Sequence, residues 1–132
     1  MPHTILAIPY DDNLRVDEIV REGVPALALS EIADLLRIDL DRLAAAMRIP
    51  RRTLDRRLAA PNKDLPFSEG NRTVRIGRLI AMALDVFEDQ ERAARWFTEK
   101  LAILGNVSPL VCCATDAGAR VVEQALGRIE HA

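Results

Sequence analysis

The sequence predicts an all-α fold, and three observations carry that prediction. Hydrophobic residues make up 49% of the 132 residues, enough for a packed core, while aromatic residues make up only 4%. Alanine and leucine, both strong helix formers, are abundant. Apolar residues recur at helical spacing along nearly the whole chain, and the one stretch that also fits a strand is "TILAIPY", residues 4–10. At this length we expect one domain, or two small ones that share a core.

Capping residues, glycines and prolines divide the first part of the chain into helices. The first helix is expected at about residues 12–22, because Gly23 and Pro25 follow it. Ser30 is the expected N-cap of a second helix that continues to about Leu36.

Residues 40–58 predict two short helices joined by a tight turn, which is a helix-turn-helix pattern. Asp39 can cap the first of them, "LDRLAAAM", and Pro50 occupies a permitted first-turn position of the second, "RRTLDRRLA". Pro61 ends the pair. The apolar contacts that such a motif needs are supplied by Leu43, Ala44, Met47, Ile49, Leu54 and Leu58.

The second half of the chain predicts further helices after a linker. "PNKDLPFSEGN", residues 61–71, is the linker by composition, and a long helix is expected from about residue 71 to 87. Another is expected at about residues 90–101. Ser108 and Pro109 have the usual order of a helix start, and Thr115 can cap a last helix that reaches Ile129.

Positive charge is concentrated in the middle of the chain. Residues 37–63 hold eight basic and three acidic residues, a net charge of +5. Residues 1–36 have a net charge of -5 and residues 64–132 of -2, so the whole chain is slightly acidic at -2. A basic segment between acidic ones is the electrostatic footprint of nucleic-acid binding, which the net charge of the whole chain conceals.

The second helix of the motif carries the candidate DNA-binding residues. Its N-terminal end is the part that reaches base edges, so Arg51, Arg52 and Thr53 are the expected base contacts. Arg56 and Arg57 are the expected phosphate contacts.

Two features leave an alternative open. Asp55 can pair with a neighbouring arginine, in which case part of this basic face is only solvated surface. Arg48 occupies the turn position where glycine is common, because a positive φ costs other residues about 1 kcal/mol. The alternative is a vestigial motif that no longer reads DNA.

The C-terminal half resembles a known family. The resemblance rests on Arg72 and Arg75 at the start of the long helix, then on "ALDVFEDQERAARWF", and finally on "GNVSPLVCCATDAGARVVEQALGRIEHA". They resemble the toxin-binding domain of the Xre/MbcA/ParS family of antitoxins, and the resemblance covers about residues 30–132. It implies an antitoxin of a type II toxin–antitoxin pair.

The resemblance also implies partners and a domain division. The usual partner is a toxin with a RES domain, which consumes NAD or transfers its ADP-ribose. The antitoxin blocks the toxin's active site with its C-terminal region and represses the shared operon through the helix-turn-helix, as a homodimer. On this basis we expect an N-terminal extension at residues 1–26, a helix-turn-helix DNA-binding domain at 27–63, and a toxin-binding and dimerisation domain at 64–132.

The end of the chain is the expected toxin contact, because the most family-like stretch runs to Ala132. The candidate residues are Arg128, Ile129, Glu130 and His131. An arginine is suited to a cleft built for phosphates or for a catalytic carboxylate. The alternative is that this segment only packs the last helix, with Arg128 solvated. Packing is also the expected role of Arg120 and Val121.

Other polar and apolar groups suggest no chemistry. Cys112 and Cys113 are adjacent, so they are expected to be small buried residues rather than a disulfide. His3 and His131 lack the spacing of a zinc site, and no catalytic constellation or cofactor-binding loop is present. We therefore expect no enzyme, no cofactor and no metal. Without an apolar run of about 20 residues, the expected location is the cytoplasm, with no membrane contact.

Three further expectations concern the long helix and its neighbours. Arg72, Arg75 and Arg78 either bind an acidic partner or are solvated. Trp96 and Phe97 are expected in the core. The apolar stripes on residues 74–87 and 96–104 suggest a self-complementary dimer interface. A plain helix-turn-helix regulator with a dimerisation domain, and a protein-only adaptor with a vestigial motif, stay open as alternative functions.

Overall fold

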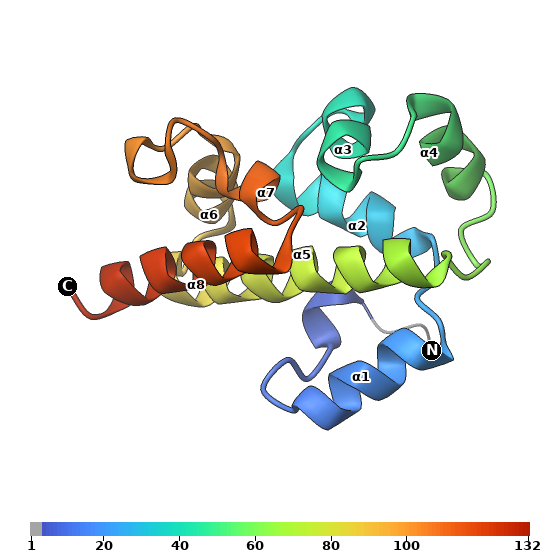
Figure 1. Ribbon diagram of the computed structural model, residues 1–132, viewed down its shortest axis with the longest axis horizontal. Coiled ribbons are helices and arrows are strands. Elements are labelled where there is room, and N and C mark those ends of the chain that lie inside the picture. The colour runs from blue at the N-terminus through green and yellow to red at the C-terminus, as the bar shows by residue number, and fades with distance from the viewer. Residues whose placement is uncertain (1–3) are drawn as a thin grey trace.

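The computed structural model describes residues 4–132 and is all-α within that range, which confirms the predicted fold class (Figure 1). Two 3-10 turns, η1 (Ile5–Ala7) and η2 (Ala102–Leu104), accompany the helices. The α-helices are α1 (Asn13–Glu22), α2 (Leu27–Leu36), α3 (Leu40–Met47), α4 (Arg51–Leu58), α5 (Phe67–Phe87), α6 (Gln90–Thr98), α7 (Pro109–Cys112) and α8 (Asp116–Glu130). His3 lies outside the described residues.

Helix α5 is the centre of the molecule. In Figure 1 it runs horizontally, with α2, α3 and α4 above it, α8 alongside it, and α1 below it. Ile76 and Leu79 on α5 are fully buried, and so are Leu29 of α2, Phe97 of α6 and Val122 of α8. These side chains belong to one hydrophobic core, so the helix-turn-helix and the C-terminal helices share a single interior.

The N-terminal segment forms a 3-10 turn, so a strand at residues 4–10 is wrong. Side chains three residues apart lie on one side of a 3-10 turn, and accordingly Ile5 and Ile8 are buried while Leu6 is exposed. The backbone N–H of Ile5 donates to the carboxylate of Glu31 on α2 at 2.8 Å, which ties this turn to the core.

Three predicted helix caps are confirmed. The side chains of Asp39, Ser108 and Thr115 each accept a hydrogen bond from the backbone N–H three residues later. These bonds lie in the first turns of α3, α7 and α8 and measure 2.8, 3.2 and 3.0 Å respectively. Each bond satisfies a donor that the first helical turn leaves free.

The starts of α2 and α5 differ from the prediction. Helix α2 begins at Leu27, so Ser30 lies inside the helix and is not its cap. The N–H of Leu27 donates to the carbonyl of Pro61 at 2.9 Å, and this tertiary bond replaces the side-chain cap. Helix α5 begins at Phe67, because Pro66 can precede a helix without losing a needed N–H. The predicted linker is therefore shorter than residues 61–71.

The end of α6 also differs, since the helix stops at Thr98 rather than near Leu101. The Thr98 hydroxyl donates to the carbonyl of Ala94 at 2.8 Å, and Leu101 then pairs with Val107 in an isolated antiparallel bridge. Hydroxyls that bond back to their own helix compete with its continuation.

Candidate nucleic-acid interface

Helices α3 and α4 form the predicted helix-turn-helix. Leu43, Met47 and Leu54 are fully buried between the two helices and the core. Arg48 in the turn has φ 57° and ψ 42°, which is the left-handed conformation. Its N–H donates to the carbonyl of Ala45 at 3.2 Å, so the strained residue closes the end of α3. A non-glycine residue is therefore accommodated at this turn position.

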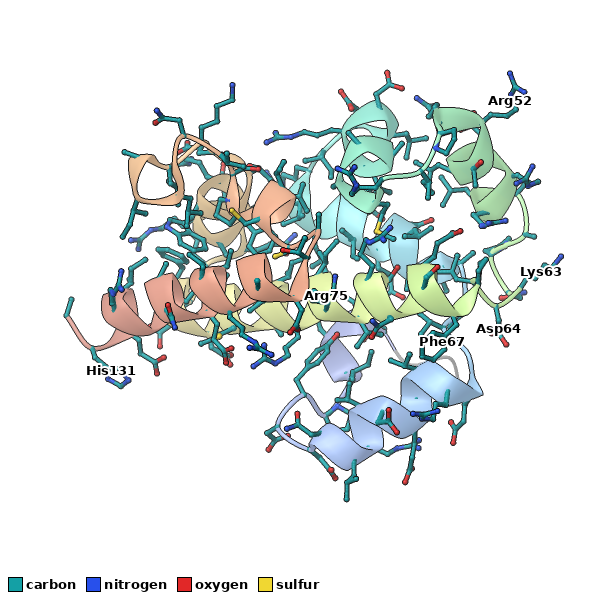
Figure 2. The ribbon with its side chains drawn as sticks, viewed as in Figure 1. Arg52, Lys63, Asp64, Phe67, Arg75 and His131 are labelled. Atoms are coloured by element: carbon teal, nitrogen blue, oxygen red, sulfur yellow. The ribbon has the colours of Figure 1, made fainter. Side chains whose placement is uncertain are left out.

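Two arginines of α4 have exposed side chains without an ion pair inside the described chain. They are Arg52 and Arg56, whose side chains are free to meet a partner. Figure 2 shows Arg52 projecting outward from the end of the molecule that α4 forms. Thr53 lies beside them and is half-buried.

Arg51 is held by two carboxylates. Its Nη1 lies 2.7 Å from Asp41 of α3, and its Nε lies 2.9 Å from Asp55 of α4. The hydrogen bonds to Asp55 and Asp41 raise the pKa of the Arg51 guanidinium. The alternative in which Asp55 pairs with a neighbouring arginine is thus confirmed for Arg51. The pair with Asp41 also fixes the guanidinium at the first turn of α4.

The side chain of Arg57 lies against α5. Its Nε and Nη2 donate to the two carboxylate oxygens of Glu69 at 2.9 and 2.8 Å. Only 22% of the Arg57 side chain and 11% of the Glu69 side chain are exposed. Hydrogen bonding to Glu69 raises the pKa of Arg57. The expected phosphate contact of Arg57 stays a prediction, and it competes with this bidentate pair.

Three arginines on α5 bond to other parts of the chain, which corrects the expectation that they are solvated or free for an acidic partner. Arg72 donates to the carbonyl of Met47 at the end of α3. Arg75 donates to the carbonyls of Cys113 and Ala114 at 3.3 Å each. The last carbonyls of a helix have no hydrogen-bond donors within the helix, and the guanidinium groups of Arg72 and Arg75 act as donors to carbonyls at the ends of α3 and α7. The third, Arg78, pairs with Glu123 of α8.

The C-terminal end of α8 is exposed. Arg128, Ile129, Glu130 and His131 are all accessible, and Ile129 is 40% exposed. In Figure 2, His131 lies at the opposite end of the molecule from Arg52. Leu126, just before this end, is fully buried, so the alternative, in which the segment only packs the last helix and Arg128 is solvated, stays open beside the toxin contact.

The residues that pack α8 are not those expected. Arg120 is exposed and pairs with Asp116 one turn earlier, and Val121 is 45% exposed. Val122 and Leu126 are fully buried and hold the helix against the core. The helical period that buries residues 122 and 126 turns residues 120 and 121 outward.

Most of the apolar stripe of the long helix is covered within the chain. Val74, Ile76, Leu79 and Ile80 are at most 3% exposed, whereas Leu84 and Phe87 near its end are half-buried, and the dimer interface stays a prediction. Phe97 is fully buried, as expected for a core residue, while Trp96 is half-buried against the core. Large apolar side chains that do reach the surface are Leu6, Leu14, Phe67, Ile103, Val111, Val121 and Ile129.

Both cysteines are free thiols, and their environment supports the interpretation as small apolar residues. Cys113 is fully buried, and this burial raises the pKa of its thiol to about 12. Burial raises the pKa of the Cys112 thiol as well. No helix in residues 4–132 is long and apolar enough to cross a membrane.

These features define a class of protein: a helix-turn-helix whose second helix is basic, built onto the same core as a C-terminal helical domain. Comparison with known families agrees. Residues 15–78 match the Antitoxin Xre-like helix-turn-helix domain, and residues 82–132 match the Antitoxin Xre/MbcA/ParS C-terminal toxin-binding domain. The chain belongs to the Xre/MbcA/ParS family of antitoxins.

Individual relatives support this membership. The chain is 34% identical to Antitoxin Xre of Yersinia enterocolitica and 28% identical to Antitoxin Xre of Photorhabdus laumondii, in both cases over 96% of this chain and 85% of the relative. It is also 25% identical to a protein of a Sphingobium species named Prs ADP-ribosylating antitoxin, over 85% of this chain and 76% of the relative.

Sequence reasoning missed two acidic residues of the candidate interface. Asp41 and Glu69 lie 10 and 12 residues from their arginine partners, outside the reach of helical spacing. One signal was present: Glu69 follows Pro66 by three residues, a place where acidic side chains favour the first turn of a helix.

Proposed function

We propose that the protein is the antitoxin of a type II toxin–antitoxin pair, which neutralises a cognate toxin and represses its own operon. One observation carries the proposal: the accessible basic residues of α4 and the accessible end of α8 lie at opposite ends of one shared core. A molecule arranged in this way can hold DNA and a protein partner at once.

In the proposed repressor, α4 enters the major groove of operator DNA. Arg51, Arg52 and Thr53 at its N-terminal end contact base edges, with Arg51 aligned by Asp41. Arg56 binds a backbone phosphate. Arg57 acts chiefly through Glu69, as the residue that orients α4 on α5. A homodimer in the cytoplasm would present two such helices to half-sites about one helical turn apart, or a multiple of that.

In the proposed inhibitor, the end of α8 enters the toxin's active site. Arg128 has the fixed guanidinium fork that suits a phosphate or carboxylate, and Ile129, Glu130 and His131 lie beside it. A RES-domain toxin that consumes NAD fits the family, and the Sphingobium relative's name refers to ADP-ribosylation. In this role the chain blocks the toxin's reaction and catalyses no reaction itself.

Coexpression with the neighbouring gene tests the proposal. We expect a stable complex by size measurement, restored growth, and cellular NAD maintained at the level of cells without toxin. A neighbour that is harmless alone, or a pair that does not associate, contradicts the antitoxin role and favours a plain regulator.

A gel-shift assay on the protein's own promoter tests the second arm. Binding that weakens steeply with salt is expected, because phosphate contacts release counterions. An absence of binding at low salt, with and without the toxin, contradicts repression and favours a protein-only adaptor with a vestigial motif.

A further inference from the structure

A basic pocket lies beside the C-terminal end of α4, beyond the helix-turn-helix motif. Its volume is about 360 Å³, and its charged lining residues are Arg56, Arg57, Lys63 and Asp64. Arg56 comes from α4, whereas Lys63 and Asp64 come from the segment that connects α4 to α5. By its composition that segment is part of the predicted linker, and Lys63 lies outside the predicted helix-turn-helix.

The backbone around Lys63 is held in place by hydrogen bonds. Its N–H donates to the carbonyl of Ala60 at 3.0 Å, and its carbonyl accepts from the N–H of Ala26 at 2.9 Å. Two residues later, the N–H of Leu65 donates to the carbonyl of Val24 at 2.8 Å. Lys63 therefore projects from a fixed point on the core. Less ordering is required when such a side chain binds a ligand.

The two acidic residues near this pocket do not neutralise Lys63 or Arg56. Glu69 is occupied by both nitrogen donors of Arg57. The Asp64 carboxylate lies against Gly23, where any added side chain would collide with it. Figure 2 shows Asp64 and Lys63 pointing in different directions. Neither Arg56 nor Lys63 forms an ion pair in the part of the chain that the structure describes.

We propose that Arg56 and Lys63 together form a phosphate site for the DNA backbone, next to the bases read by the N-terminal end of α4. The proposal rests on the proposed DNA binding and extends its contact surface past the motif. Lysine binds phosphate as a point charge and arginine as a planar fork, so the pair can hold one phosphodiester between them.

The placement of this pair fits a recognition helix in the major groove. The first residues of such a helix reach base edges, so its C-terminal end lies nearer the sugar–phosphate wall. In Figure 2 Arg52 and Lys63 project from the same end of the molecule, and Lys63 points away from its body. A DNA duplex bound at Arg52 would therefore also pass near the ammonium group of Lys63.

Amine labelling of the full chain gives a direct test, because the sequence contains only two lysines, Lys63 and Lys100. The protein is acetylated with and without a duplex of its own promoter, and each site is quantified by mass spectrometry. We expect the duplex to slow labelling of Lys63 several-fold, while Lys100, in the loop after α6, serves as the internal control. Equal labelling of Lys63 in free and bound protein overturns the proposal.

The substitution Lys63→Ala gives a second, independent measurement. The bonds that hold this segment use the backbone, so the variant keeps the fold, which circular dichroism checks. We expect the slope of log K against log salt to fall by about one unit per DNA-bound chain, with Lys63→Arg restoring it. If Lys63→Ala leaves the slope unchanged while the wild-type protein binds DNA, the phosphate site is overturned but DNA binding is not. Failure of the wild-type protein to bind overturns DNA binding and this site together.

Discussion

Arg57 of α4 and Glu69 of α5 form a bidentate ion pair at 2.9 and 2.8 Å, and both side chains are largely buried. The pair joins the basic helix of the motif to the central helix of the molecule. Together with the bond from Arg72 to the carbonyl of Met47, it makes the helix-turn-helix part of the common core rather than an appended unit.

The first prediction concerns this pair. Glu69→Gln should lower the free energy of unfolding by about 1–3 kcal/mol, because it leaves the Arg57 guanidinium without its charged partner. Urea unfolding measures the change. Asp116→Asn, which removes the exposed partner of Arg120, is the matched control and should change stability by less than about 0.5 kcal/mol. Equal losses of unfolding free energy in the two variants would contradict the claim that burial makes the Arg57–Glu69 pair the stronger one.

Base recognition gives the second prediction. Arg52→Ala should weaken binding to the specific promoter by about 1–3 kcal/mol, because an exposed arginine without an internal partner is suited to a bidentate contact with guanine. Fluorescence anisotropy with specific and unrelated duplexes measures it. The deletion of residues 128–132 is the control and should bind DNA normally. An equal loss on both duplexes would make Arg52 a phosphate contact.

Toxin neutralisation gives the third prediction. Deletion of Arg128 through Ala132 should release toxin activity and leave the fold intact, because these residues are exposed while Val122 and Leu126 anchor α8. Growth and cellular NAD are followed during coexpression with the toxin. Arg52→Ala, at the other end of the molecule, should still protect. Full protection by the truncated protein would place inhibition on another surface.

A pair of glycines provides the fourth prediction. Gly77→Ala should destabilise the protein by about 1–3 kcal/mol, because the new Cβ would collide with Ile5 and the Tyr10 hydroxyl. Gly127→Ala meets open space and should instead stabilise α8 by up to about 1 kcal/mol. Thermal unfolding of both variants checks the opposite signs. A stabilised Gly77→Ala protein would show that the N-terminal turn is loosely held.

The fifth prediction concerns alkaline pH. Burial raises the pKa of Cys113 from 9.0 to about 12, so the folded chain keeps a proton that the unfolded chain loses. The contribution of this thiol to the free energy of unfolding should therefore be constant below about pH 9 and fall by about 1.4 kcal/mol per pH unit between pH 9 and 12. Urea unfolding across this range measures the slope, and Cys113→Ala should reduce it. A variant with an unchanged slope would contradict the assignment to this thiol.

Local patterns in the sequence determined the helices and their class. Apolar spacing, together with the caps Asp39, Ser108 and Thr115, predicted most helix positions, because capping is a bond between residues two or three apart. The turn at Arg48 and the burial of Leu43, Met47 and Leu54 followed from the same reasoning. These contacts lie close together along the chain, where one sequence is enough to identify them.

Only the tertiary structure decided which charged groups already have a partner within the chain. Five arginines between residues 48 and 58 look alike in the sequence, yet Arg51 is held by Asp41 and Arg57 by Glu69, while Arg52 stays open. Lys63 acquires its fixed position from backbone bonds to residues far back in the chain. Such pairings depend on how α3, α4 and α5 pack against one another, and helical periodicity carries no information about partners that meet across helices.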